Sequence, residues 1–412
     1  METRLADFIK GTPEGTEAES ILRKCVHCGF CTATCPTYQL LGDELDGPRG
    51  RIYLIKQVLE GTAATAKTQL HLDRCLTCRS CETTCPSGVQ YGRLLDIGRD
   101  VVEQQVGRGG AASLQRAALR KVISNPSLFG PLLKLGQLVR PLLPAALKQK
   151  IPTRTAPAKP WPQPRHARKM LVLEGCAQPS LSPATNAATA RVLDAIGITL
   201  VRAQKAGCCG AVSFHLNAQD EALTAMRRNI DAWWAHITQG AEKIVITASG
   251  CGVMVKDYAH ALAHDTAYAE KAQRVSELAC DISEVIAAEK AALITRLTPH
   301  TSRLTQRVAF HAPCTLQHGL KKKGAVEALL TELGFNLTPV ADAHLCCGSS
   351  GTYSILQPAL SSQLRDNKIS ALTQGAPHAI LTANVGCQSH LQSATALPVR
   401  HWIEALDDLL SR

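Results

Sequence analysis

Cysteine is the residue type in this chain whose number and spacing point to chemistry, and two copies of one motif lie near the N-terminus. The motif C-x2-C-x2-C-x3-C-P occupies residues 25–36, as CVHCGFCTATCP, and residues 75–86, as CLTCRSCETTCP. Three thiolates at this spacing reach three irons of a [4Fe–4S] cluster from one loop, while the fourth binds the other cluster. The pattern predicts one cluster bound by Cys25, Cys28, Cys31 and Cys85 and a second bound by Cys35, Cys75, Cys78 and Cys81.

Two zinc sites are the alternative for these eight cysteines. Structural zinc sites usually combine pairs of C-x2-C, whereas each motif here contains a triple, so iron–sulfur clusters are favoured. Pro36 and Pro86 follow the fourth cysteine of each motif and remove a backbone donor there. Because neither motif has a substrate-sized site of its own, the region predicts an electron relay, and no catalytic residue is assigned to this chain.

A second set of cysteines is organised around two vicinal pairs, Cys208-Cys209 and Cys346-Cys347, each followed by a glycine. The spacing from Cys176 to Cys208 equals that from Cys314 to Cys346. The flanking segments also correspond, since LDAIGI matches LTELGF, MRRN matches LRDN and IVITASGC matches AILTANVGC. We therefore predict that the second half of the chain contains two copies of one unit, called here the CCG unit after its Cys-Cys-Gly sequence.

Each CCG unit has short apolar strands alternating with helical patterns, which indicates parallel α/β structure. Because the carboxyl ends of parallel strands meet at one edge, the cysteines there are candidate metal ligands. Three alternatives remain open: an iron–sulfur centre in each unit, zinc or a redox disulfide in at least one, or buried cysteines without a ligand. His311 lies close to this second set in sequence, either as a neighbour of the site or as an ordinary histidine. The candidate ligands are Cys176, Cys208, Cys209 and Cys251 in the first unit and Cys314, Cys346, Cys347 and Cys387 in the second.

The expected fold class is α + α/β, with a helical bis-[4Fe–4S] ferredoxin-like domain followed by two duplicated CCG units with parallel strands. The first domain spans residues 1–100, with its two motifs at about 14–45 and 66–95. Residues 101–168 form a basic amphipathic helical segment and a Pro-rich linker, and the CCG units span 169–300 and 301–412. Cys280 falls outside the cysteine groups and is expected to be a small core residue.

Composition restricts the cellular setting. The N-terminus lacks the apolar stretch of a secretion signal, and no long uninterrupted apolar run could cross a bilayer, so we expect a cytoplasmic protein in which thiols stay reduced. The formal net charge of +11 resides in residues 104–173, which contain no Asp or Glu. This segment could be a solvated linker, lie on an anionic membrane or dock an acidic face of a partner. Nucleic acid is not expected as a partner because the segment has few aromatics to stack on bases.

The order of these motifs resembles the iron–sulfur subunits of glycolate oxidase. The resemblance is carried by the paired ferredoxin loops, the two CCG units, and the segments GPRGR, SGCG and VGCQSH. The iron–sulfur subunits of anaerobic glycerol-3-phosphate dehydrogenase share the same layout. The CCG units alone also resemble those of heterodisulfide reductase and of lactate-utilisation proteins. In heterodisulfide reductase the unit ends in C-x-x-C, whereas the last position here is Met254 or His390.

The resemblance implies a subunit of a 2-hydroxy-acid dehydrogenase complex. FAD would lie on a separate partner subunit that oxidises glycolate, and also D-lactate, to the 2-oxo acid. This agrees with the chain, which has no G-x-G-x-x-G signature of its own. Electrons would pass through the clusters to a membrane acceptor such as quinone, with the protein bound peripherally at the cytoplasmic face of the inner membrane. The alternatives are the glycerol-3-phosphate enzyme and a disulfide-reducing or non-enzymatic iron–sulfur protein.

Overall fold

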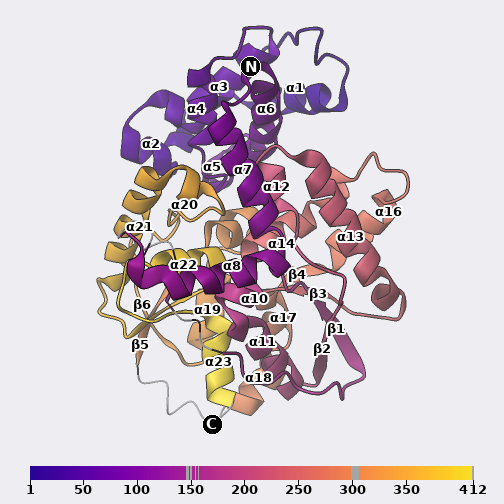
Figure 1. Ribbon diagram of the computed structural model, residues 1–412, viewed down its shortest axis with the longest axis vertical. Helices are drawn as coiled ribbons and strands as arrows, with labels where there is room; N and C mark the ends of the chain where they lie inside the picture. Colours follow the sequence, from indigo (N-terminus) through magenta and orange to yellow (C-terminus); the bar gives the residue numbers. More distant parts are fainter. Residues whose placement is uncertain (145–147, 149–150, 154, 156, 298–305, 411–412) are drawn as a thin grey trace. The chain divides into compact units, whose positions relative to one another are not determined.

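The computed structural model describes residues 1–144, 148, 151–153, 155, 157–297 and 306–410 (Figure 1). It contains two compact units. The first comprises Met1–Ala117 and His344–Leu364, and the second comprises Ala118–Ala343 and Arg365–Arg412. The expected boundary between the two CCG units, at residues 300 and 301, lies outside the described residues.

The first unit is helical. Its elements are α1 Pro13–Lys24, η1 Phe30–Thr32, α2 Pro36–Leu41, η2 Glu44–Asp46, α3 Pro48–Leu59, α4 Ala66–Asp73, α5 Ser80–Thr84, α6 Tyr91–Val106, the start of α7 Gly110–Ile123, and α20 Tyr353–Leu356. Proline at the first position of α1, α2 and α3 is pre-set for helical geometry and loses no hydrogen bond there. Thr65 caps α4 in a reciprocal arrangement with Thr68.

Close packing of α3 against α6 forms the centre of this unit. Ile55 of α3 and Leu94 and Leu95 of α6 are fully buried. Gly98 allows the approach, because a Cβ atom there would lie 2.6 Å from Cγ1 of Ile55. The helices thus hold the two cysteine loops, which precede α2 and α5, on a rigid base.

The second unit contains two four-stranded parallel sheets with the same strand order (Figure 1). The first sheet is ordered β2-β1-β3-β4 and the second β6-β5-β7-β8. The strands are β1 Arg168–Val172, β2 Ile198–Arg202, β3 Ile244–Ile246, β4 Ala279–Asp281, β5 Arg307–His311, β6 Asn336–Thr338, β7 Ala379–Thr382 and β8 Val399–His401. The predicted fold class, with a helical cluster-binding part followed by two duplicated parallel α/β units, is confirmed.

Helices connect and cover these strands. They are α8 Pro126–Val139 with η3 Arg140–Leu142, α10 Gln178–Leu181, α11 Pro183–Ala195, α12 Ala211–His215, α13 Gln219–Thr238, α14 Ser249–Lys256, α15 Tyr258–Ala261, α16 Ala269–Leu278, α17 Ile282–Ala288, α18 Lys290–Leu297, the π-helical turn η5 Thr315–Gly319, α19 Ala325–Glu332, α21 Pro358–Thr373, α22 Val385–Gln392 and α23 Trp402–Leu410. Helices α11 and α23 pack together, and Trp402 is fully buried in a core that the two sheets share. Arg191 of α11 pairs with Asp407 of α23 at 2.6 Å.

The basic segment contains α7 and α8, and α8 is followed by the 3-10 turn η3, which contains Pro141. Much of its positive charge is neutralised within the chain. Arg116 pairs with Asp73 in the first unit, and Arg120 pairs with Glu221 in the second. Arg168 pairs with both Glu242 and Glu289. The segment therefore presents less free positive charge than its composition indicates.

Candidate iron–sulfur centres

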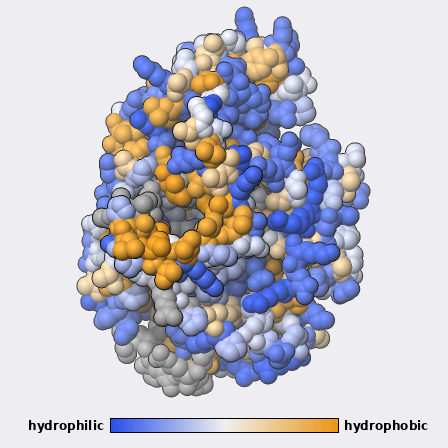
Figure 2. Space-filling view, in the orientation of Figure 1, coloured by the Kyte–Doolittle hydropathy of each residue, from blue (hydrophilic) through white to orange (hydrophobic). Residues whose placement is uncertain are grey.

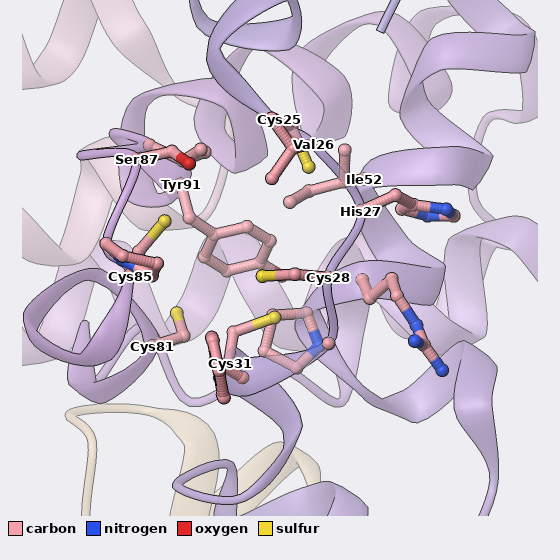
Figure 3. A pocket seen from close by; sticks show the side chains of 16 residues that line it. Cys25, Val26, His27, Cys28, Cys31, Ile52, Cys81, Cys85, Ser87 and Tyr91 are labelled. Carbon is pink, nitrogen blue, oxygen red and sulfur yellow. The ribbon is translucent and has the colours of Figure 1, made fainter.

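The first group of predicted ligands surrounds one cavity in the first unit. Cys25, Cys28, Cys31 and Cys85 line it together with Cys81, and the Tyr91 ring lies among them (Figure 3). The pKa of Cys31 is raised to about 11, mainly by burial and also by repulsion from the neighbouring Cys25, Cys85 and Cys28. These four sulfurs would repel one another as thiolates, so their joint ionisation requires a bound cation.

The two cysteine loops share positive backbone φ angles at corresponding positions. Residues before and after the second cysteine of each motif adopt positive φ: His27 at 60° and Gly29 at 87° in the first loop, and Thr77 at 53° and Arg79 at 58° in the second. Three of these four residues are not glycine. Such conformations cost free energy in other residues and persist only where the surrounding structure enforces them. The matching strained turns indicate that both loops are shaped to direct three sulfurs inward.

The second group lies deeper in the same unit. The Cys81 thiol is buried, and burial raises its pKa well above the ordinary value, with Cys78, Cys75 and Cys35 adding to the effect by repulsion. Tyr91 Oη donates to Cys75 Sγ at 3.6 Å, and the Thr77 N–H donates to the same sulfur at 3.4 Å. The structure therefore brings together Cys35 with the three cysteines of the second loop.

These two groups fit the chemistry of iron–sulfur clusters. Each offers four sulfur donors, three from one loop and one from the other motif, as cubane ligation requires. The hydrogen bonds to Cys75 Sγ are of the kind that stabilise a sulfur carrying negative charge.

The first CCG group lies wholly in the second unit. Cys176 follows β1, Cys208 and Cys209 lie in the loop after β2, and Cys251 lies in α14 after β3. The side chains interact in a chain, Cys176 with Cys208, Cys208 with Cys209, and Cys209 with Cys251. All but Cys251 are buried, and Cys251 is half-buried. The strand ends thus bring all four predicted ligands together.

Cys208 is the thiol of this group that ionises most readily. Hydrogen bonds from the Cys176 and Cys209 side chains lower the pKa of Cys208 well below its ordinary value, and the Gly210 N–H donates to its sulfur at 3.5 Å. The Cys176 thiol donates a hydrogen bond to Cys208, which raises the pKa of Cys176, and burial raises it as well. Four sulfur donors, with the Cys208 thiol the most acidic of them, therefore lie close enough to interact, as a metal site requires.

Two buried polar residues, which the sequence analysis missed, fix the backbone of this vicinal pair. Asn229 of α13 donates to the Cys208 carbonyl at 2.9 Å and accepts from the Gly207 N–H at 2.8 Å. Tyr258 Oη donates to the Cys209 carbonyl at 2.9 Å. Asn229 belongs to the MRRN segment, whose counterpart in the second copy is LRDN, and this correspondence was the available signal.

The second CCG group is divided between the two units, with Cys346 and Cys347 in the first and Cys314 and Cys387 in the second. Within the first unit, the Gly348 N–H donates to Cys346 Sγ at 3.4 Å, as Gly210 does to Cys208. Within the second, Asn384 Nδ2 donates to Cys387 Sγ at 3.4 Å.

His311 lies beside Cys387. Its Nδ1 is 3.0 Å from Thr382 Oγ1, and burial lowers the pKa of the imidazole to about 3. A ring nitrogen of His311 and the Cys387 sulfur are within 4.8 Å of one another. Of the two sequence alternatives for His311, the structure supports a neighbour of the second group.

The segment that carries Cys346 and Cys347 is bonded to the second ferredoxin loop inside the first unit. Ser350 Oγ donates to the Leu76 carbonyl at 2.6 Å, and Tyr353 Oη donates to the Arg74 carbonyl at 3.1 Å. These two carbonyls flank Cys75. The vicinal pair of the second CCG unit is therefore attached next to a predicted cluster ligand.

Family comparisons agree with this architecture. A model described as "4Fe-4S dicluster domain" matches residues 21–89, and a model described as "Cysteine-rich domain" matches residues 170–256 and 308–392. The fold and the cysteine groups thus define a protein that joins a dicluster iron–sulfur domain to two CCG domains. Among the described residues, no helix combines the length and apolar character needed to cross a bilayer.

Similarity to curated proteins identifies the family more closely. The chain is 58% identical over 412 residues to the glycolate oxidase iron–sulfur subunit of Escherichia coli (strain K12), covering 100% of both chains. It is 29% identical over 402 residues to a probable glycolate oxidase iron–sulfur subunit of Bacillus subtilis (strain 168), covering 90% of this chain and 88% of the relative. Lactate utilization protein A of Bacillus licheniformis is 26% identical over 201 residues, which is 48% of this chain and 80% of the relative. The chain belongs to the family of glycolate oxidase iron–sulfur subunits, as its motifs led us to expect.

Proposed function

We propose that this chain is the electron-transfer subunit of a flavin-dependent glycolate oxidase. A separate subunit carrying FAD oxidises glycolate to glyoxylate, and D-lactate to pyruvate, and this chain receives the electrons. The observation that supports the proposal most strongly is the pair of four-cysteine groups in one compact unit, in a chain with a full-length relative of that function. Two clusters supply one-electron steps between a two-electron flavin and the final acceptor.

We assign the cluster ligands as the spacing predicts and as the two groups are arranged in the first unit. The first cluster is held by Cys25, Cys28, Cys31 and Cys85, and the second by Cys35, Cys75, Cys78 and Cys81. The protein contributes five buried cysteines, the more exposed Cys28, Cys31 and Cys85, and two loops with positive φ at matching positions.

The test uses the full chain purified without oxygen, with iron and sulfide measured per chain and the reduced protein examined by EPR. Cys78→Ser should remove the second cluster and slow cluster reduction by the flavoprotein and glycolate. Cys280→Ser is the matched control, because Cys280 is a buried cysteine that packs in the core of the first sheet. Unchanged iron, sulfide and reduction rate in Cys78→Ser would contradict the assignment. If glycerol 3-phosphate and its flavoprotein reduce the clusters and glycolate does not, the proposed substrate is wrong and glycerol 3-phosphate takes its place.

We also propose that the first CCG group binds an iron–sulfur centre. The four sulfurs interact in a chain at the edge where the parallel strands end, and as thiolates they would repel one another unless a cation neutralised them. The expected result is more than about eight irons per chain, since two cubanes account for that number. Cys208→Ser should lower the iron content without affecting the ferredoxin-type EPR signals. Zinc in place of iron, or titratable thiols without metal, would reject an iron–sulfur centre here.

We further propose that helix α8 rests on the membrane surface, where quinone is the acceptor. Figure 2 shows apolar residues gathered over this helix, and Leu128, Leu132 and Leu135 lie at helical spacing with about half of each side chain exposed. Leu138 and Leu142 are exposed still further, at 77% and 87%.

Vesicle sedimentation tests this surface. With vesicles of phosphatidylglycerol and phosphatidylethanolamine, serine at positions 132, 135 and 138 should abolish co-sedimentation of the full chain. Leu114→Ser is the control, because Leu114 of α7 is more exposed than Leu132 and Leu135 but lies outside α8. If the triple variant still sediments with vesicles but no longer binds the flavoprotein, α8 docks the partner subunit and the membrane proposal fails.

A further inference from the structure

A buried arginine lies beside the second cysteine group. Arg51 of α3 has no exposed surface, and its Nε donates to the His71 carbonyl at 2.7 Å. Its Nη1 donates to Thr37 Oγ1 at 3.1 Å, and that hydroxyl is 3.3 Å from Cys35 Sγ. Burial disfavours the charged guanidinium, but the buried Asp46 carboxylate offsets this, and an arginine side chain keeps its proton in proteins. A permanent positive charge is thus fixed next to two proposed ligands of the second cluster.

The other charges in this network leave it positive. Asp46 is fully buried and accepts from Arg51 at 3.3 Å and from Arg74 at 2.8 Å. Two cations therefore share one carboxylate, with His71 Nδ1 3.2 Å from the same group. On the opposite side of the loop, Glu82 interacts unfavourably with Cys81. The Glu82 carboxylate is half-buried and accepts from the Gly92 N–H at 2.6 Å. Its negative charge therefore weakens the effect of the buried Arg51 charge but does not cancel it.

Tyr91 adds a second effect at the same group. Its hydroxyl donates to Cys75 Sγ, while its ring lines the cavity of the first group (Figure 3). The phenol O–H is the donor in this contact, so Tyr91 supplies a hydrogen bond to a proposed ligand sulfur. Hydrogen bonds to the sulfurs and net charge are, together with cluster type and solvent exposure, determinants of cluster reduction potential. The hydrogen bond from Tyr91 and the charge of Arg51 both favour the more negative, reduced state of the second cluster.

The surroundings of the first group differ. Among the described residues that line its cavity, Arg49 supplies the one guanidinium, and it forms a bidentate ion pair with Glu44. The two side chains are 35% and 40% exposed, so the pair is neutral and in contact with water. Water screens such a pair strongly. The two groups therefore differ in the charge that surrounds them, although their cysteine motifs are nearly the same.

We propose that Arg51 and Tyr91 make the second cluster the more easily reduced of the two, and so set the direction of transfer within the pair. One electron leaves the first cluster, which is oxidised by one electron, and enters the second, which is reduced by one electron. The inference rests on the ligand sets proposed above. Arg51 and Tyr91 act as positioning and tuning residues, since neither is a ligand.

Potentiometric titration of the full chain, followed by EPR, tests this assignment. Tyr91→Phe and Arg51→Gln should each lower the midpoint potential of one cluster by at least 59 mV. For a one-electron couple this is a tenfold change in the reduction equilibrium. The affected signal should be the one that disappears in Cys78→Ser. Arg51→Lys should keep the midpoint potential close to that of the unmodified chain, because lysine keeps the positive charge. Arg49→Gln is the control and should leave that midpoint unchanged.

Three results would overturn the inference: no shift in either variant, a shift of the first cluster instead, or a first cluster that is already the easier to reduce in the unmodified chain. Tyr91→Phe decides the question if Arg51→Gln fails to fold, because it removes a single oxygen atom. Iron and sulfide analysis distinguishes a failure of the tuning inference from a failure of the proposed function. A chain with both clusters but unshifted midpoints rejects only the tuning, whereas a chain without clusters rejects the ligand assignment.

Discussion

The vicinal pair Cys208-Cys209 offers a direct test of how the first CCG group is held. Replacing Asn229 with leucine keeps the number and branching of the side-chain heavy atoms but removes both the donor to the Cys208 carbonyl and the acceptor for the Gly207 N–H. Asn229 is fully buried, so water cannot replace these partners without opening the loop. Tyr258 also loses the Asn229 Nδ2 donor at 3.0 Å but still donates to the Cys209 carbonyl.

The expected cost follows from the groups left without partners. An unsatisfied buried donor or acceptor costs roughly 1–3 kcal/mol. The Cys208 carbonyl retains a weak contact with Arg228 Nη2 at 3.4 Å, so the Gly207 N–H is the clearest orphan. We therefore expect Asn229→Leu to destabilise the second unit by about 3 kcal/mol. Tyr258→Phe, which removes only the bond to the Cys209 carbonyl, should cost about 1 kcal/mol.

Two measurements on the full chain check this expectation. Urea unfolding reports the loss of stability, and amide hydrogen exchange over residues 207–210 reports whether the loop has opened locally. The metal content of the CCG group should fall in Asn229→Leu and remain near normal in Tyr258→Phe. The reasoning is wrong if Asn229→Leu unfolds within about 0.5 kcal/mol of the unmodified chain and its loop amides exchange no faster.

Other predictions concern packing, pH and the attached segment. Gly98→Ala should destabilise the first unit by about 1–3 kcal/mol, since the new Cβ would overlap Ile55, and calorimetry would show an unchanged transition if this is wrong. Burial raises the pKa of Asp281 to about 6. The folded chain therefore binds the proton more tightly than the unfolded chain, and stability should fall by about 3 kcal/mol as pH rises from about 4 to 6. Urea unfolding of Asp281→Asn should lack this slope. Removing the hydroxyl of Tyr353 with phenylalanine should increase proteolysis of residues 344–364, because the bond to the Arg74 carbonyl is lost, while cleavage at the unmodified rate would contradict this.

Local spacing made much of the architecture predictable. The two C-x2-C-x2-C-x3-C-P motifs place three sulfurs on one short loop, so the sequence itself determines which cysteines can lie together. The duplicated spacing between Cys176 and Cys208 and between Cys314 and Cys346 predicted two equivalent sheets, and both have the same strand order. The role of these cysteines as ligands stays a prediction.

Properties that depend on tertiary packing were not predictable in the same way. Arg51 occupies a helical position in GPRGRIYLIK, where an arginine would ordinarily be exposed, and only the fold shows that it is buried against Cys35 and Cys75. The positive charge of residues 104–173 left three roles open, namely a solvated linker, a membrane-bound segment and a dock for an acidic partner. Much of it is paired because Asp73, Glu221 and Glu242, distant in sequence, lie next to it.

The segment 344–364 has a consequence for the order in which the chain can mature. It belongs to the first compact unit, yet it follows almost the whole of the second unit in sequence. During synthesis the N-terminal helices leave the ribosome long before Ser350 and Tyr353 are available to bind the carbonyls that flank Cys75. The cysteine loops therefore stay uncovered on that side until the chain is nearly complete, which leaves time for cluster insertion before the last segment closes over the second loop.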